Sequence, residues 1–331
     1  MKVLFIGGTG IISSACASLA LERGVDLYFL NRGQSSDRPV PAGVQVFRGD
    51  IRDRSSASAA LLGRLFDVVV DWVAYTPEHV ETDLELFSGR TGQYIFISSA
   101  SAYQTPPSSL PVTESTLLDN PYWLYSRNKI ACEERLVRAY RQDKFPMTIV
   151  RPSHTYDRTT LPIDGGYTVV NRMRQGKPVI VHGDGTSLWV LTHHKDFARG
   201  FVGLLGNSHA IGDDFHITSD EVLNWNQIFD LVAKAAGAQA RIVHVPSDLI
   251  AAYDSEWGAG LLGDKAVSMV FDNSKIKRIV PDFFASIPFS RGVEEIMAWY
   301  DADPARQVVD EKLDRLIDRI LNAYESAWPK A

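Results

Sequence analysis

Two side chains in the middle of the chain have the chemistry of a proton-transfer site. Tyr125 and Lys129 stand four residues apart, a spacing that places both on one face of a helix. A tyrosine hydroxyl has an ordinary pKa near ~10, so it needs a stabilising neighbour to act as a base near neutrality. An ammonium group held nearby supplies this, because it favours the charged phenolate. Tyr125 is therefore a candidate general acid/base with Lys129 beside it.

The same spacing recurs at Tyr140 and Lys144, so the pattern alone is weak. The second pair lies in a polar stretch, which predicts a solvated helix end. The first pair instead follows the apolar run 94–97, which ends in the hydroxyl residues Ser98 and Ser99. Ligands of doubly wound folds bind at the carboxyl edge of the parallel sheet. We therefore expect the first pair, and not the second, to lie in a functional site.

A glycine-rich turn follows the first apolar run of the chain. Gly7 allows a tight turn, and Gly10 lets the backbone approach a pyrophosphate at the start of the next helix. Ser13 occupies the third glycine position of this pattern and is small enough for close packing. The alternative is a plain glycine turn, but the order of strand, turn and helix favours a dinucleotide site. The predicted contacts in this turn are Gly7, Thr9, Gly10, Ile11 and Ile12.

The end of the second apolar run bears on the choice of cofactor. A site that prefers NAD carries a carboxylate there for the ribose 2′-hydroxyl, whereas this chain has Asn31 and Arg32. A guanidinium can hold a 2′-phosphate with two hydrogen bonds, although a solvated surface arginine remains the alternative. NADP is thus slightly favoured over NAD. Asp50 and Ile51, after the third run, are predicted to flank the adenine.

The elements that must position these residues alternate along the first half of the chain. Apolar runs rich in β-branched residues are separated by stretches whose apolar residues are three and four apart. This alternation predicts an α/β fold, a doubly wound parallel sheet of the Rossmann type. The expected strands are 3–6, 25–30, 44–47, 66–70, 94–97 and 147–150, and the expected helices are 13–23, 55–65, 78–87 and 122–140.

Beyond Pro152 the alternation of strands and helices becomes irregular. Glycine loops and short helices there predict a smaller C-terminal α+β substrate domain. We assign residues 1–157, plus roughly 178–207, to the Rossmann domain. The substrate domain takes roughly 158–177 and 208–331. The apolar spacing over 303–328 predicts a terminal helix that packs on its own domain or on a partner.

Composition excludes several classes of function. The 331 residues carry 34 basic and 40 acidic side chains, a net charge of −6, so nucleic acid is an unlikely partner. Two cysteines are too few for a disulfide framework and fit a reducing compartment. The chain lacks the ~18 consecutive apolar residues of a membrane span, and its first apolar run is too short for a signal peptide. We expect a cytoplasmic protein.

The order of these motifs resembles the extended short-chain dehydrogenase/reductases, also called the NAD-dependent epimerase/dehydratase family. Within this family, the motifs of the chain are most similar to those of the branch that includes the chloroplast stem-loop-binding proteins. The resemblance implies that Ser99 is the catalytic serine, Tyr125 the catalytic acid/base and Lys129 the ribose-binding lysine. The further cofactor contacts that it implies are Val73, Ala74, Ser98, Pro152 and Ser153.

The chain departs from this family where the substrate would bind. Ala100 and Ser101 replace an acidic pair that dehydratases carry, which disfavours dehydration. Trp189 stands where nucleotide-sugar enzymes usually place an arginine for the diphosphate, and His154 stands in place of a substrate-facing asparagine. An indole can stack on a sugar but carries no charge. The predicted substrate contacts are Tyr75, Ser101, His154 and Trp189.

A second arginine of those enzymes is also missing, near Lys265. That lysine and Lys195 could compensate, but a point charge lacks the fork that grips a diphosphate. The sequence thus predicts an NAD(P)-dependent epimerase or reductase acting on a hydroxyl or ketone of a sugar-like small molecule. The alternatives are a nucleotide-sugar epimerase and an RNA-binding protein on the same fold. The sequence is compatible with a homodimer.

Metal binding was also considered for the histidines. His193 and His194, near His182, form the only local cluster in the sequence. Neighbouring residues on a strand point to opposite faces, so this pair should not chelate together. We therefore expect no metal site.

Overall fold

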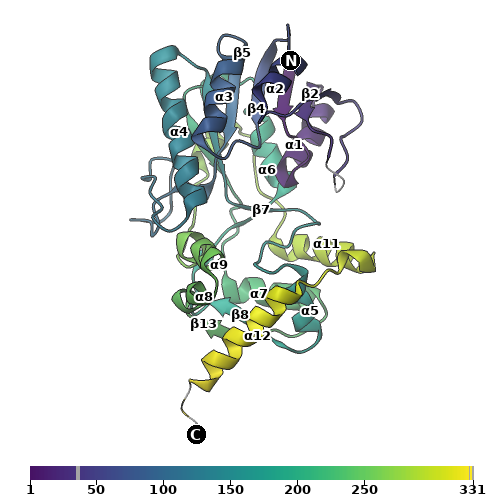
Figure 1. Ribbon diagram of the computed structural model, residues 1–331, viewed down its shortest axis with the longest axis vertical. Coiled ribbons are helices and arrows are strands. Elements are labelled where there is room, and N and C mark those ends of the chain that lie inside the picture. Colours follow the sequence, from purple (N-terminus) through teal and green to yellow (C-terminus); the bar gives the residue numbers. More distant parts are fainter. Residues whose placement is uncertain (35–37, 328, 330–331) are drawn as a thin grey trace.

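The computed structural model describes residues 1–34, 38–327 and 329. Its upper part in Figure 1 is built on a parallel sheet of seven strands in the order β11-β6-β5-β4-β1-β2-β3. The central strands β1, β4, β5 and β6 are buried on both faces, as is typical of parallel sheets, whereas the edge strand β3 is partly exposed. The strands are β1 (Lys2–Ile6), β2 (Asp26–Asn31), β3 (Gln45–Arg48), β4 (Phe66–Asp71), β5 (Thr91–Ile97), β6 (Met147–Pro152) and β11 (Asp214–Ile217).

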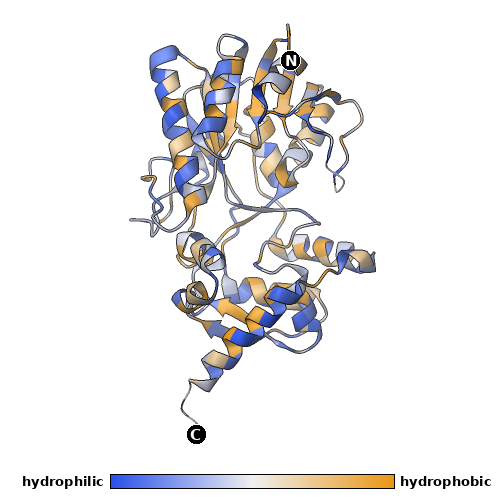
Figure 2. Cartoon of the chain, viewed as in Figure 1, coloured by the Kyte–Doolittle hydropathy of each residue, from blue (hydrophilic) through white to orange (hydrophobic). Residues whose placement is uncertain are grey.

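Helices cover both faces of the sheet. Val3 and Phe5 of β1 pack towards α1 and α6, whereas Leu4 and Ile6 pack towards α2, α3 and α4. In Figure 2 the strands of this part are largely orange and the helices alternate between blue and orange, the pattern of one buried face per helix. The helices are α1 (Ile11–Glu22), α2 (Arg54–Ala60), α3 (Pro77–Phe87), α4 (Leu124–Asp143), α6 (His194–Val202) and α10 (Ser274–Ile279).

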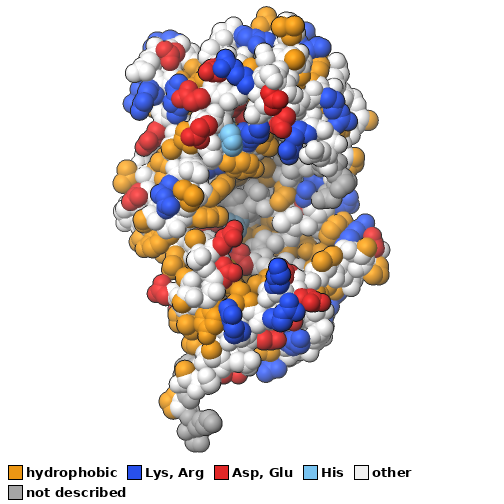
Figure 3. Space-filling model, in the orientation of Figure 1, with side chains coloured by type: hydrophobic (Ala, Val, Ile, Leu, Met, Phe, Trp, Pro, Cys, Tyr) orange, Lys and Arg blue, Asp and Glu red, His pale blue; other side chains and the backbone are white. Residues whose placement is uncertain are grey.

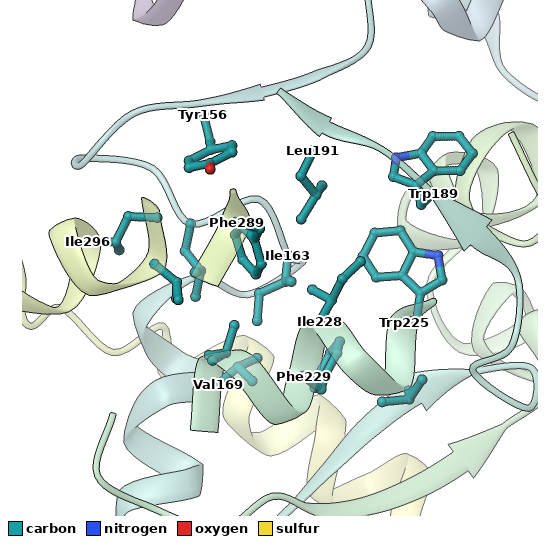
Figure 4. Packing of buried hydrophobic residues seen from close by; sticks show 14 of the residues in the cluster. Tyr156, Ile163, Val169, Trp189, Leu191, Trp225, Ile228, Phe229, Phe289 and Ile296 are labelled. Atoms are coloured by element: carbon teal, nitrogen blue, oxygen red, sulfur yellow. The ribbon is translucent and has the colours of Figure 1, made fainter. Parts of the chain in front are cut away.

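The lower part of the molecule is made of helices and short strand pairs. Its main core holds two large indoles, Trp189 and Trp225, packed with Ile228 and Phe229 (Figure 4). The strands are β7 (His154–Tyr156) with β10 (Leu191–His193), β8 (Pro178–His182) with β13 (Arg241–Val245), and β9 (Leu188–Trp189) with β12 (Leu223–Asn224). The helices are α5 (Tyr167–Arg174), α7 (Trp225–Ala235), α8 (Ser247–Tyr253), α9 (Ser255–Gly260), α11 (Phe289–Asp301) and α12 (Glu311–Ser326).

Helix α12, the last helix of the described residues, packs against the lower part of the molecule. Ile317, Ile320 and Leu321 are buried in a cluster with β8 and α8. The fully buried Arg172 side chain of α5 donates to Asp314 at 2.5 Å and to Asp318 at 2.7 Å. The predicted terminal helix therefore exists, but it begins at Glu311, after a short 3-10 turn over Pro304–Arg306. Residue 328 lies outside the described residues.

The structure corrects the predicted domain boundaries at two strands. Strand β8, assigned to the Rossmann domain, pairs with β13 of the lower part. Strand β11, assigned to the substrate domain, pairs with β6 and completes the large sheet. Both strands satisfy their backbone groups with partners distant in sequence, which local patterns do not reveal. Among the described residues, every helix is too short or too polar to cross a lipid bilayer.

Candidate active site

A groove of about 550 Å³ opens at the carboxyl edge of the sheet, beside the point between β1 and β4 where the strand order reverses. This switch point is where doubly wound folds bind their ligands. We call it the sheet-edge groove. Gly7 lines it with a φ of +97°, a conformation that L side chains rarely adopt. The groove is lined by Ile6, Gly7, Thr9, Leu30, Asn31, Arg32, Gly33, Gln34, Val40, Arg48, Gly49, Asp50, Ile51, Arg52, Val73, Tyr75 and His79.

Most of the predicted cofactor contacts gather at or near this groove. Those that line it are Gly7, Thr9, Asn31, Arg32, Asp50, Ile51 and Val73. The remaining ones lie on adjoining segments: Gly10, Ile11 and Ile12 at the start of α1, Ala74 after β4, Ser98 after β5, and Pro152 and Ser153 at the end of β6. Gly10 donates its N–H to Ser13 Oγ at 2.8 Å, so this serine supports the turn from within the helix.

Two buried polar atoms here suit a dinucleotide. Asn31 Oδ1 and Ser98 Oγ are buried, and neither has a hydrogen-bond partner among the described residues. Buried polar atoms without a partner are rare in native folds, and a bound ligand is one explanation for them. The groove also combines glycine backbone with the apolar side chain of Ile51. The residues present therefore fit a nicotinamide dinucleotide.

Guanidinium groups dominate the β2 and β3 side of the groove. Arg32, Arg48 and Arg52 all line it, and the end of β2 carries the neutral Asn31 where a carboxylate would select NAD. Arg48 lies directly over Gly33: a Cβ on this glycine would fall 1.0 Å from the guanidinium. The sequence pattern indicated Arg32 but not Arg48 or Arg52. Both residues lie beside the end of the third strand, and this position could have indicated them as groove residues.

Ser99, Tyr125 and Lys129 come together where β5 ends against α4. The Ser99 hydroxyl lies within reach of the Tyr125 phenol and stabilises its charged form. Ser99 Oγ also lies 2.9 Å from Ser101 Oγ, which accepts a hydrogen bond from Ser126 Oγ at 2.8 Å. The serine chain fixes the hydroxyl that faces Tyr125. The three predicted catalytic residues are therefore adjacent in the structure.

The Lys129 ammonium is buried and held by backbone oxygens. It donates to Ala74 O and to Ile97 O, both at 2.7 Å, and lies 4.7 Å from the centre of the Tyr75 ring. An ammonium has three N–H donors, so one remains for a ligand. Burial lowers the pKa of Lys129 to about 8. This geometry suits a lysine that binds a ribose hydroxyl at the end of the groove.

Tyr125 differs in one respect from the expectation drawn from the sequence. Burial raises the pKa of Tyr125 to about 12, and this outweighs the opposing effect of the Ser99 hydroxyl. The negative charge of Asp264 acts in the same direction as burial. Lys129 Nζ lies 5.7 Å from the centre of the ring, and its hydrogen bonds go to Ala74 O and Ile97 O. In the protein alone Tyr125 is thus a proton donor at neutral pH.

Two buried carboxyl groups support the segment that follows β4. Asp71 Oδ1 accepts from Val73 N at 2.5 Å and from Ala74 N at 2.9 Å, and Asp83 accepts from the Tyr94 hydroxyl at 2.6 Å. Asp71 Oδ2 and Asp83 Oδ1 are buried without a hydrogen-bond partner among the described residues, and burial together with the Asp71 charge raises the pKa of Asp83 well above its usual value. A second negative charge beside Asp71 is unfavourable, so Asp83 keeps its proton.

Asp83→Asn is expected to change how stability depends on pH. The folded wild type holds a proton on Asp83 that the unfolded chain releases above its ordinary pKa near ~3.9. Folding then binds a proton, so wild-type stability falls as pH rises towards the raised pKa, by about 1.4 kcal/mol per pH unit. Asparagine has no such proton, so the variant gains stability relative to wild type as pH rises.

Urea denaturation between pH 5 and 7 measures this difference. The exposed Asp67→Asn serves as the control, and its difference from wild type should stay constant across this range. A constant difference for Asp83→Asn as well would show that Asp83 does not keep its proton in the folded protein.

The predicted substrate contacts differ in accessibility. Figure 3 shows a hollow between the upper and lower parts of the molecule. Tyr75 is 45% exposed at the edge of the groove, and the His154 side chain is 20% exposed. Ser101 is buried among the serines described above. Trp189 is only 2% exposed, so the prediction that its indole stacks on a substrate is wrong for this structure: Trp189 belongs to the core, against Trp225 and the His154 ring.

The other patterns noted in the sequence lie elsewhere. Tyr140 packs over Gly212 near the end of α4, and Lys144 ends this helix with a φ of +57°, so the second pair is a helix terminus. His193 ends β10 and His194 begins α6, so they are not neighbours on one strand, and their rings lie 4.7 Å apart. Within the described ranges no three His, Cys, Asp or Glu side chains form a metal-binding group.

Comparison with known proteins identifies the family. The model of the NAD dependent epimerase/dehydratase family matches residues 3–218. The chain belongs to this family. The match covers the strands that carry the sheet-edge groove and the segment with Ser99, Tyr125 and Lys129. This family member is an NAD-dependent enzyme of the extended short-chain dehydrogenase/reductase type, which confirms the resemblance stated from the motifs.

Relatives of this epimerase/dehydratase family member differ in their named activities. The chain is 28% identical over 258 residues to the chloroplast stem-loop binding protein of 41 kDa b of Arabidopsis thaliana, over 73% of this chain and 65% of that protein. It is 25% identical over 310 residues to a 2′-dehydrokanamycin reductase of Streptomyces kanamyceticus, over 90% of this chain and 84% of the relative. It is 30% identical over 168 residues to a UDP-glucose 4-epimerase of Lactobacillus helveticus, over 46% and 51%.

Solved structures share the fold. An epimerase of Methanothermobacter thermautotrophicus superposes with a TM-score of 0.75 at 18% identity, over 92% of this chain and 94% of that one. A UDP-glucuronic acid 4-epimerase of Bacillus cereus, solved with UDP-glucuronic acid and NAD, gives 0.72 at 20% identity, over 91% and 99%. The predicted α/β fold is thus confirmed.

Proposed function

We propose that this enzyme reduces a ketone, or epimerises a hydroxyl carbon, of a sugar-like small molecule with NAD(P). The observation that carries the proposal is the junction of β5 and α4. There Ser99 reaches Tyr125, and the buried Lys129 ammonium keeps one free donor at the end of the sheet-edge groove. These are the groups that hydride chemistry on a carbinol carbon requires from the protein.

Each residue of this set has a distinct task. Tyr125 donates its proton to the substrate oxygen in reduction and takes it back in oxidation. Ser99 holds that oxygen by a hydrogen bond. Lys129 orients the ribose, and its positive charge favours the phenolate. When bound, the nicotinamide supplies or accepts the hydride. Because Tyr125 is protonated at neutral pH, the protein alone is prepared for the reductive direction.

Native mass spectrometry of the purified protein separates the two chemistries. An epimerase must return the hydride to the same substrate, so it is expected to retain NAD tightly. A reductase exchanges its cofactor in each cycle, so an empty protein that takes up NADPH supports reduction. A protein that binds neither dinucleotide would overturn the proposal.

We further propose that NADP is preferred, because guanidinium groups line the groove near the end of β2, and Asn31 occupies the position where a carboxylate would select NAD. Arg32→Ala is expected to weaken NADP(H) binding by about 1.5–3 kcal/mol, the range for hydrogen bonds to charged groups, and to leave NAD(H) binding nearly unchanged. Titration calorimetry with both cofactors measures this. Arg48→Ala tests whether the second guanidinium shares the 2′-phosphate. Equal affinity of the wild type for NAD and NADP would exclude the preference.

The proposed substrate is a free or simply substituted sugar, polyol or small carbonyl compound without a nucleoside diphosphate. No arginine occupies the Trp189 position, and Lys265 is already paired with Asp164 at 3.6 Å. A buried pyrophosphate needs several donors or positive charges. Lys195 lines a different cavity, with Glu295 and Arg306.

The names of the epimerase relatives favour the alternative, a nucleotide-sugar substrate. Thermal-shift measurements with UDP-, GDP- and dTDP-sugars in the presence of cofactor decide between the two. We expect no stabilisation. Micromolar affinity that is lost in Lys265→Ala or Lys195→Ala would establish the nucleotide-sugar alternative instead. RNA binding is suggested by the name of the Arabidopsis thaliana relative, but a net charge of −6 disfavours it. A gel shift with structured RNA at low salt tests this alternative.

A further inference from the structure

An imidazole–carboxylate pair lies outside the Ser99, Tyr125 and Lys129 set. His154 Nε2 is 2.7 Å from Asp264 Oδ2. His154 begins β7, and Asp264 lies in a π-helical turn over Leu261–Lys265. The side chains are 20% and 6% exposed, so the carboxylate is enclosed and the imidazole is partly accessible. We call it the His154–Asp264 dyad.

The turn that carries Asp264 is held firmly. Asn120 Nδ2 donates to Gly263 O at 2.6 Å and to Ser101 O at 2.8 Å, while Asn120 Oδ1 accepts from the N–H groups of Tyr122 and Trp123. On the other side of the turn, Lys265 O is bonded by the side chains of His182, Ser187 and Trp225. A buried carboxylate held in this way has a fixed position.

The same contacts place the dyad beside Tyr125. Asn120 joins the Asp264 turn to Ser101 and to the residues that begin α4, two positions before Tyr125. Ser101 in turn contacts Ser99. The charge of Asp264 is felt by the Tyr125 phenol, whose pKa it helps to raise. The dyad and the predicted acid/base therefore belong to one site.

One nitrogen of the His154 ring is free. Because Nε2 is committed to Asp264, the neutral ring carries its proton there and Nδ1 is an acceptor. Nδ1 has no hydrogen-bond partner among the residues that the structure describes. It is also absent from the buried polar atoms that lack a partner, so it is accessible to solvent. The edge of the ring is braced by Trp189, with ring centres 5.2 Å apart at 90°. Nδ1 is therefore an oriented acceptor that is open to a ligand.

We propose that the His154–Asp264 dyad binds a second hydroxyl of the substrate, so that the enzyme selects α-hydroxy ketones in reduction and vicinal diols in oxidation. This rests on the proposed function of the site. His154 Nδ1 accepts the hydroxyl proton as a hydrogen bond, and Asp264 is a positioning residue that fixes the ring. The buried carboxylate also repels phosphate, so the substrate is a neutral polyhydroxy compound.

The test compares α-hydroxycyclohexanone with cyclohexanone, which lacks only the second hydroxyl. With NADPH and the wild type, kcat/KM for the hydroxy ketone should exceed that for the plain ketone about tenfold or more, because a site built for a hydroxyl rejects the analogue without one. His154→Leu should abolish this ratio, because it should lower kcat/KM for the hydroxy ketone about tenfold more than kcat/KM for cyclohexanone. His154→Asn restores a polar atom near the Nδ1 position and should recover part of the ratio.

Asp264 is tested by the same ratio. Asp264→Asn keeps an oxygen that accepts from Nε2 and should retain most of the preference, whereas Asp264→Leu should lose it. Because both substrates share Tyr125, the effect of the Asp264 charge on the phenol cancels in the ratio. Equal loss with both ketones in His154→Leu, or a wild type without preference, would overturn the role of the dyad.

Binding measured separately keeps the two proposals distinct. Ligand-observed NMR with NADP⁺ and trans-cyclohexane diol or cyclohexanol reports affinity without turnover, in the wild type and in Tyr125→Phe. A diol preference that disappears in His154→Leu supports the dyad even if the enzyme turns over neither ketone, in which case only the proposed chemistry fails. Turnover of both ketones with no preference for the diol in binding would refute the dyad and leave the proposed function standing.

Discussion

Tyr125→Phe is expected to lower turnover about 10²–10⁴-fold, the contribution of a general acid/base, while the fold and the cofactor affinity are retained. The substitution removes only the hydroxyl that Ser99 faces and leaves the ring in place against Trp123, at 5.0 Å between ring centres. Steady-state kinetics with NADPH and a sugar-like ketone, together with calorimetry of the cofactor, measure the two quantities separately.

Tyr140→Phe is the matched control. Tyr140 has the same spacing to a lysine but lies near the far end of α4 against Gly212. It should turn over substrate like the wild type. If both variants lost activity equally, the acid/base would have to be another residue.

The second large effect concerns stability. Glu133→Ala is expected to lower the free energy of unfolding by about 3–5 kcal/mol, because it leaves a buried guanidinium without its main partner. Arg151 Nε donates to Glu133 at 2.9 Å and its Nη2 at 2.5 Å, and both side chains are about 95% buried. The same guanidinium bonds Tyr103 and Asp214, so it joins α4, β6 and β11. Urea denaturation followed by circular dichroism measures the loss.

The surface pair of Arg135 with Glu81 on α4 and α3 supplies the comparison. Its glutamate side chain is 51% exposed, and exposed ion pairs contribute about 0–1 kcal/mol. Glu81→Ala should therefore cost less than 1 kcal/mol. Similar losses from both variants would mean that the buried pair adds nothing beyond an ordinary ion pair.

The sequence contained enough to predict the core of the fold. All six expected strands form, with ends that differ by at most three residues, because runs such as 66–70 are apolar on both faces. Strands β8 and β11 were assigned to the wrong domain. Both are short and pair with segments far along the chain. Their pairing depends on the tertiary structure, which no local pattern records.

The site shows the same division between local and distant information. Tyr125 and Lys129 were found because a helix brings residues four apart to one face. The Asp264 turn is joined to this site through Asn120, and the raised pKa of Asp83 depends on a strand and a helix that meet in three dimensions. Trp189 was judged from its position in a family pattern, which does not record that the indole is buried.

The pairing of β8 with β13 has a consequence for how the chain folds during synthesis. Strand β8 is complete at His182, but its partner ends only at Val245. Until the ribosome has released that segment, β8 presents an apolar strand, with Val179 to Val181, and an unpaired edge. Strands β1 to β6 by contrast have neighbours made earlier or soon after them. The nascent lower part is therefore the region most exposed to wrong pairing, and the part where a chaperone would be most useful.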